Sequence, residues 1–215
     1  MIYGVSINGI DTLEAWGLML LADVTVEAPA LKEYTADIPG GDGSLDYSAY
    51  TGYPHYKDRK LSFTLFSGVE DKALQNIRTA LMLAWHGQQV ELVLPDDVAH
   101  CYRGVLQVGE SSGYNSGCIP ITMRAEPLRY ALQDTMVIHE GNGSRQLENH
   151  GMPVTPEITT TAETKISWRE GEHTIVLSEG AGQYVSALVL PRNGTLTLEI
   201  ETEGSVTFVW REGVL

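Results

Sequence analysis

Apolar and polar residues alternate along much of this chain, which is the pattern of β-strands that bury one face. The clearest case lies within residues 57–66, where Leu61, Phe63 and Leu65 alternate with polar side chains. This segment predicts a strand with its apolar row against a core and its polar row in solvent.

Turn signals separate several further strands in the first half of the chain. Residues 2–7 alternate and end at Asn8-Gly9, a dipeptide typical of a tight hairpin turn. Pro120 lies inside an alternating run, and proline cannot donate to a strand ladder. We therefore expect its strand to lie at a sheet edge or to carry a bulge. The other expected strands are 18–21, 23–27, 31–38, 90–94, 101–108 and 118–125.

One segment has the period of a helix. The run from Ser67 to Glu70 matches a capping box, in which the two side chains satisfy backbone N–H groups at the start of a helix. Gly87 supplies a stop signal. We predict one helix whose apolar stripe covers one side of a sheet. Met82 and Trp85 lie off this stripe, and they either widen it or face a partner. The stripe consists of Leu74, Ile77, Leu81 and Ala84.

The stretch from residue 38 to residue 58 has neither the apolar period of a strand nor that of a helix. It begins with Pro39 and a cluster of glycines, and tyrosine then recurs at every third position. Tyrosine combines a large rigid area with a hydroxyl group, which suits contact surfaces. Two interpretations stay open: a structured surface loop that packs on its own domain, and a contact between subunits. The tyrosines are Tyr47, Tyr50, Tyr53 and Tyr56.

The second half of the chain has no helical period. This loss places a domain boundary near Gln133 and predicts two domains, 1–133 and 134–215. Alternating runs separated by short turns with Gly and Asn are typical of a small β-sandwich. The expected strands are 135–140, 145–148, 157–161, 165–169, 173–178, 184–190, 195–201 and 206–211.

Composition narrows the class of protein. The net charge is −14, spread over both halves, which disfavours a nucleic-acid binder because phosphate binding needs clustered basic residues. The nearest cluster, Lys57, Arg59 and Lys60, is interpreted as a solvated strand edge. No apolar run reaches the ~18 residues of a membrane helix, and no basic segment followed by an apolar run opens the chain.

The two cysteines, Cys101 and Cys118, are expected on neighbouring strands of a hairpin. If Val108 faces Cys118, then Cys101 faces Ala125, and the sulfurs lie roughly 23 Å apart at ~3.3 Å per residue. A disulfide needs Cα atoms within about 7 Å. Two thiols without a disulfide fit assembly in a reducing cytoplasm, and their spacing fits no zinc pattern.

No pattern for a metal site or a cofactor site is found in the sequence. Asp42 and Asp46 share one loop and could bind calcium. The alternating acidic loop with its closing glutamate is missing, so we favour a turn-forming role for both.

The search for catalytic residues also yields no constellation. His55, Tyr56 and Asp58 are close in sequence, but no nucleophile motif accompanies them, so they are interpreted as polar loop residues. Glu199 and Glu201 share one face of a strand, whereas glycosidase carboxylates must converge across a cleft. We therefore expect a protein that is not an enzyme.

The order of motifs resembles the distal tail proteins (Dit) of siphophages. A Pro-Gly-x-Asp-Gly turn is followed by a Gly-Tyr pair and by an arginine that opens an alternating strand. The residues that match are Pro39, Gly40, Asp42, Gly43, Leu45, Asp46, Gly52, Tyr53, Arg59, Leu61 and Phe63. Further similar passages are Ile7–Ile10, Trp16–Leu18, Asn149–Gly151 with Pro153 and Pro156, and Trp210–Leu215, with a partial match at Leu190–Leu196.

The resemblance implies a mainly β fold: an N-terminal β-sandwich or belt domain with one α-helix, then a small galectin-like β-sandwich. In that family the belt domains form a hexameric ring that joins the tail tube to the baseplate hub. We therefore expect a structural protein of a phage or prophage virion tail, assembled in the host cytoplasm, with itself, the tube protein and the hub protein as partners. The candidate interface residues are Pro39, Gly40, Asp42, Gly43, Tyr47, Tyr53, Tyr56 and Arg59.

Two other functions stay open. The second domain could be a carbohydrate-binding module for host glycans, with Trp168, Tyr184 and Trp210 as exposed aromatic contacts. Against this, tryptophans on strands are usually packed in a core. The chain could also be another tail component, such as a tube or tail-completion protein.

The separation of the two cysteines can be tested directly. After denaturation without a reductant, a thiol reagent should titrate both Cys101 and Cys118, because strand geometry keeps their sulfurs apart. Recovery of no titratable thiol from the non-reduced protein would contradict this prediction.

Overall fold

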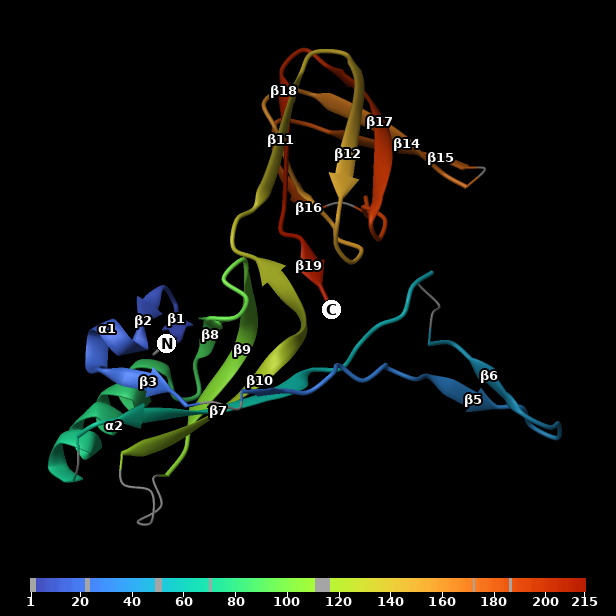
Figure 1. Ribbon diagram of the computed structural model, residues 1–215. Coiled ribbons are helices and arrows are strands. Elements are labelled where there is room, and N and C mark those ends of the chain that lie inside the picture. The colour runs from blue at the N-terminus through green and yellow to red at the C-terminus, as the bar shows by residue number, and fades with distance from the viewer. Residues whose placement is uncertain are drawn as a thin grey trace. The chain divides into compact units, whose positions relative to one another are not determined.

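The computed structural model describes residues 3–21, 24–48, 52–69, 71–110, 117–171, 173–185 and 187–215. The chain divides into two compact units, Met1–Arg129 and Tyr130–Leu215 (Figure 1). Strands dominate both units, so the expected mainly β fold class is confirmed. That each unit folds as an independent domain stays a prediction.

Strands of the first unit form one sheet in the order β2-β1-β8-β9-β10-β7-β3, and β4 also pairs with β7. Ile7 of β1, the second strand of this path, and Leu18 of β3, the last strand, belong to the same core. The sheet therefore encloses a single hydrophobic core. The strands of this sheet are β1 (Ser6–Ile7), β2 (Ile10–Asp11), β3 (Leu18–Leu20), β4 (Thr25–Val26), β7 (Arg59–Ser67), β8 (Gln89–Val93), β9 (His100–Val108) and β10 (Cys118–Ala131), whereas β5 (Thr35–Asp37) and β6 (Ser44–Asp46) pair only with each other.

The first turn of the chain is the hairpin that its sequence predicts. Asn8 and Gly9 connect β1 to β2 with φ values of 51° and 79°, as a two-residue turn of type I′ requires. Ser6 pairs with Asp11, and Ile7 pairs with Ile10.

The predicted helix is α2 (Asp71–Trp85), and it packs against the sheet (Figure 1). Leu74, Leu81 and Trp85 are buried, whereas Ala84 is exposed. The expected stripe was therefore wrong at its end: the larger indole occupies the core in place of the alanine. Gly87 follows with φ 75°, the left-handed conformation that ends helices.

The start of α2 departs from the predicted capping box. Ser67 is the last residue of β7, and its hydroxyl accepts a hydrogen bond from the N–H of Val69 at 3.3 Å. Glu70, the other half of the box, lies outside the described residues.

A second, shorter helix, α1 (Thr12–Trp16), was not expected from the sequence. The Asp11 carboxylate accepts from the N–H groups of Leu13 and Glu14, and Gly17 closes the helix in the left-handed conformation. Its last residue, Trp16, makes an edge-to-face contact with Trp85 at 5.1 Å between ring centroids. This contact joins the N-terminal segment to α2.

Pro120 lies inside the sheet, so the prediction of an edge strand was wrong. Its residue pair on β7 is Thr64, and its carbonyl accepts the N–H of Gly109 at 2.8 Å. A residue in an antiparallel ladder directs its N–H and C=O toward the same neighbour, so the missing donor faces Gly109. The Gly109 carbonyl instead accepts from Nε–H of Arg78 on α2 at 3.0 Å. The helix thus replaces the ladder bond that proline cannot make.

The pairing of β9 with β10 also differs from the predicted register. The prediction placed Val108 opposite Cys118. The hydrogen bond from the N–H of Gly109 to the carbonyl of Pro120 instead places Gly109 opposite Pro120. Sequence alone could not place this register because residues 111–116 between the strands have no pattern. The shift moves Cys101 and Cys118 further apart along the hairpin, and neither forms a disulfide.

The second unit is a sandwich of two four-stranded sheets, β11-β18-β13-β16 and β12-β17-β14-β15. Its core combines residues from both sheets, such as Phe208 of β18 and Leu198 of β17. The strands of the two sheets are β11 (Thr135–Glu140), β12 (Gly143–Asn149), β13 (Glu157–Thr160), β14 (Thr164–Glu170), β15 (His173–Glu179), β16 (Gly182–Val185), β17 (Gly194–Thr202) and β18 (Ser205–Trp210), and a further short strand, β19 (Gly213–Val214), lies outside both sheets.

Most predicted strands of this unit are confirmed to within two residues. The exception is the run 184–190, of which only the start belongs to β16. Leu190 instead forms an isolated bridge with Val154. Beside it the buried Asn149 side chain donates to the carbonyls of Met152 and Pro191, which stabilises the Asn149–Gly151 turn.

A polar cluster secures the turn between β8 and β9. The Asp97 carboxylate contacts Nδ1 of His100 at 2.8 Å and accepts from Arg129 at 2.7 Å. Burial acts to raise the pKa of Asp97, but the hydrogen bonds and charges of His100 and Arg129 outweigh it, and the pKa lies below its usual value.

This cluster predicts an acid-dependent contribution to stability. The pKa of Asp97 is lower in the folded protein than in the unfolded chain, where it is about 3.9. The Asp97 carboxylate therefore stabilises the fold at pH values above the unfolded pKa, and this stabilisation is lost as the pH falls through the folded pKa. Asp97→Asn should destabilise the protein by roughly 1 kcal/mol at pH 7. Thermal unfolding at pH 7 and pH 3 checks this, and a variant that is equally destabilised at both would contradict it.

Candidate functional site

The segment between β4 and β7 forms an extended hairpin, which we call the arm (residues 31–48). Strands β5 and β6 pair antiparallel, with Thr35 opposite Asp46 and Asp37 opposite Ser44. Figure 1 shows this hairpin reaching away from the sheet of its unit. The sequence interpretation had placed residues 44–46 in a loop, so β6 is a correction. Two short alternating runs around a Gly-rich turn are the signal that could have found it.

The tip of the arm is the Pro-Gly-x-Asp-Gly turn. Gly40 and Gly43 adopt φ values of 75° and 85°, which residues with a side chain resist. The turn is closed by hydrogen bonds that Gly41 and Ile38 donate. Four predicted interface residues, Pro39, Gly40, Asp42 and Gly43, therefore lie together at this tip, and all four are exposed.

The calcium alternative receives no support from this geometry. The described residues contain no group of three or more His, Cys, Asp or Glu that could hold a metal ion. The Asp46 carboxylate instead accepts the N–H of Ser48 at 2.8 Å, and hydrogen bonds from Ser48 lower its pKa. This is the turn-forming role that the sequence favoured.

Every residue from 31 to 47 is exposed. Among them are Tyr34, 60% exposed, and Leu45, 50% exposed. A two-stranded hairpin without a covered face is marginal in water at best. The arm therefore offers apolar and aromatic area that no described part of its own unit covers. The large exposed side chains are Leu31, Tyr34, Ile38, Leu45 and Tyr47.

The base of the arm is built by the returning chain. The N–H of Lys32 donates to the carbonyl of His55 at 2.8 Å, and Tyr56 bridges to Leu31. The rings of Tyr53 and His55 make a tilted contact with 5.1 Å between their centroids, and both residues are half-buried. The structure thus brings Tyr53 and Tyr56 to the base while Tyr47 lies on the hairpin. Tyr50 lies outside the described residues.

Arg59 differs from the other interface candidates because its side chain is buried, only 6% exposed. Its guanidinium lies over the ring of Tyr102 at 5.1 Å, and Nε and Nη2 have no hydrogen-bond partner. Burial lowers its pKa, and the Arg129 charge adds to this, against the effect of Tyr102. As the first residue of β7 it shares the inward face with Leu61, so the expectation of a surface contact was wrong for this residue.

The three candidate sugar contacts also differ in burial. Trp168 and Trp210 are buried in the core of the second unit, so neither indole is presented for stacking on a sugar. Tyr184 is half-buried, and its hydroxyl donates to the Gly180 carbonyl at 3.0 Å. The glycan hypothesis therefore rests on Tyr184 alone.

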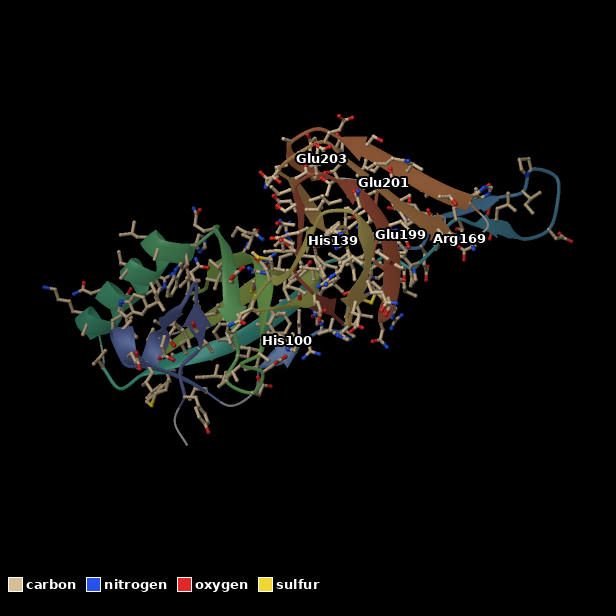
Figure 2. The ribbon with its side chains drawn as sticks, turned by 90° about the horizontal axis from the view of Figure 1, so that it is seen from above. His100, His139, Arg169, Glu199, Glu201 and Glu203 are labelled. Atoms are coloured by element: carbon tan, nitrogen blue, oxygen red, sulfur yellow. The ribbon has the colours of Figure 1, made fainter. Side chains whose placement is uncertain are left out.

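The glutamates of the second unit do not converge. Glu199 and Glu201 are exposed on one face of β17, as the sequence predicted, and Figure 2 shows them in a row with Glu203. The Glu201 carboxylate contacts Lys165 of the neighbouring β14 at 3.4 Å. A row of carboxylates along one strand lacks the facing pair of a glycosidase.

No family model matches the chain, and no curated protein matches it in sequence. The crystal structure of SPP1 Dit, described as a paradigm of the hub adsorption apparatus in phages that infect Gram-positive bacteria, is similar to it. The TM-score is 0.68 at 15% identity, over 100% of both chains. This likeness confirms a Dit-like fold. No helix in the described parts of the chain could span a membrane.

The burial of Arg59 generates a stability prediction. Because two of its donors are buried without partners, replacing the charge with an apolar side chain removes a desolvation cost while losing the stacking on Tyr102. Arg59→Met should leave the free energy of unfolding unchanged or raise it, by up to about 1 kcal/mol. Denaturant unfolding measures this, and a loss above 2 kcal/mol would show that the guanidinium has a partner in solution.

Proposed function

We propose that this protein is a structural subunit of a phage tail, acting in the hub or baseplate at the distal end. The proposal is supported by the likeness to SPP1 Dit along both whole chains, together with the motif order of the arm. The first unit is then the belt domain and the second the galectin-like domain. The place of the protein is the virion tail, with assembly in the host cytoplasm.

The role of such a protein is structural: it connects other tail proteins. Copies of the chain, six in the family that it resembles, form a closed ring that joins the tail tube to the hub protein. Each copy contacts the next through a surface that differs from the one it offers to the copy before, so the contacts repeat around the ring. No cofactor and no catalysis is needed.

The observation that carries this proposal is the arm. It projects exposed Tyr and Leu side chains on a hairpin that has no core of its own. Burying this area against a second copy would stabilise the arm and the ring together, because aromatic side chains contribute strongly to interfaces. The half-buried Tyr53 and Tyr56 hold the base from which the arm projects.

Tyr47→Ala tests the arm as the ring contact. Tyr47 is exposed, so truncation should leave the melting temperature of the subunit unchanged. An interface aromatic is worth about 2 kcal/mol, roughly 30-fold in one contact, and a closed ring loses this at every interface. Electron microscopy and light scattering, alone and with the tube or hub protein, should therefore show loss of rings.

Two control variants make this result specific. Leu83→Ala removes an 83% exposed side chain from α2 and should leave assembly unchanged. Leu74→Ala removes a core side chain and should cost about 2–5 kcal/mol of stability in the subunit itself. A wild-type protein that stays monomeric with every tail partner would overturn the proposal, whereas rings that tolerate Tyr47→Ala would overturn only the arm as the ring contact.

A further inference from the structure

Two cations lie directly opposite each other on the outer face of the sheet. Lys60 of β7 and Arg124 of β10 are a cross-strand pair, and both side chains are exposed, that of Arg124 by 74%. Like charges directly opposite each other in an antiparallel pair are destabilising. Arg124 forms a long ion pair with Asp58, whose carboxylate is 3.7 Å from its Nε and is itself largely exposed. Such a long, solvated contact offsets little of the repulsion.

This pair lines a hollow of about 370 Å³ in the surface of the first unit. Gln107 and Thr122 add polar side chains to the same hollow, and its remaining lining residues are Glu27, Asp58, Arg59 and Met123. The two cationic heads and the Gln107 amide can donate to a carboxylate that enters between them. We call this hollow the receptor.

The arm of this same chain carries the complementary charge. Within residues 31–48 the sequence holds one basic residue, Lys32, against four acidic ones. The acidic residues are Glu33, Asp37, Asp42 and Asp46. Asp46 is engaged by Ser48, whereas Asp42 is exposed at the tip between two glycines, where no bulky neighbour shields it.

We propose that the tip of the arm of one copy docks in the receptor of the next copy, with the Asp42 carboxylate between Lys60 and Arg124. This inference rests on the proposed ring. A head-to-tail contact of this kind uses different surfaces on the two sides, so every copy gives one tip and takes one, and the ring can close. The docked carboxylate offsets the repulsion within the cationic pair. Opposite charges also steer the tip to its site and disfavour wrong docking.

Charge reversal tests the pairing directly. The receptor variant, Lys60→Glu with Arg124→Glu, and the tip variant, Asp42→Lys, should each weaken assembly at least about tenfold in light scattering at low salt. An equimolar mixture of the two should assemble, because each tip then meets a receptor of opposite charge in an alternating ring. The triple variant should assemble by itself, and wild-type assembly should weaken as salt rises.

Two controls keep the test falsifiable. Lys60→Gln with Arg124→Gln removes the repulsion without adding charge, so the subunit should stay folded while assembly weakens. Lys72→Glu with Lys165→Glu makes the same charge change at exposed sites elsewhere and should have no effect on assembly.

The outcomes separate this inference from the proposed function. Wild-type rings that tolerate both reversals, or mixtures that fail to assemble although both variants are folded, would overturn the docking of the tip and leave the ring in place. A wild-type protein that never assembles would overturn the ring itself.

Discussion

Antiparallel pairing along β7 is the constraint on which the first unit depends. Eight consecutive residue pairs join β7 to β10, from Arg59–Ala125 to Phe66–Cys118, while β3 and β4 pair with its other edge. The inward row of β7 provides Leu61, Phe63 and Leu65 to the core that α2 covers. Because side chains alternate strictly along a strand, every residue on the outer row is left for solvent or for another chain.

Neighbouring residues of β7 therefore differ in burial. Arg59 and Lys60 are both basic, but the period of two places the first over Tyr102 inside the unit and the second in water opposite Arg124. A buried cation can only stabilise or strain its own subunit, whereas an exposed cation that faces another cation gains from an anion of a partner. Position in the pleat, not residue type, decides which of the two cations is buried and which is exposed.

The arm contributes no buried residue to the core of its unit. The sheet and α2 form their core without it, since every residue from 31 to 47 is exposed. An element that adds no burial to its own unit and displays Tyr34, Leu45 and Tyr47 gains stability only when another surface covers it. Substitutions on the arm are therefore expected to act on the proposed assembly, and substitutions in the core on folding.

The sequence by itself determined the local structure. The Asn8-Gly9 turn, the helix that ends before Gly87, the alternation of β7 and nearly all strands of the second unit follow from backbone sterics and from periods of 2 and 3.6 residues. These signals act between neighbours in the chain, so they can be identified without the fold. The likeness to Dit could also be recognised from the order of turns.

Only the tertiary structure decided which distant residues meet. Arg78 completes the hydrogen bond that Pro120 cannot, and Trp85 enters the core against Trp16, although neither role follows from the local pattern. The pairing of β5 with β6 and the opposition of Lys60 and Arg124 likewise depend on register between separate segments. The physical reason is that register and burial minimise the free energy of the whole unit, and no single stretch of sequence contains that sum.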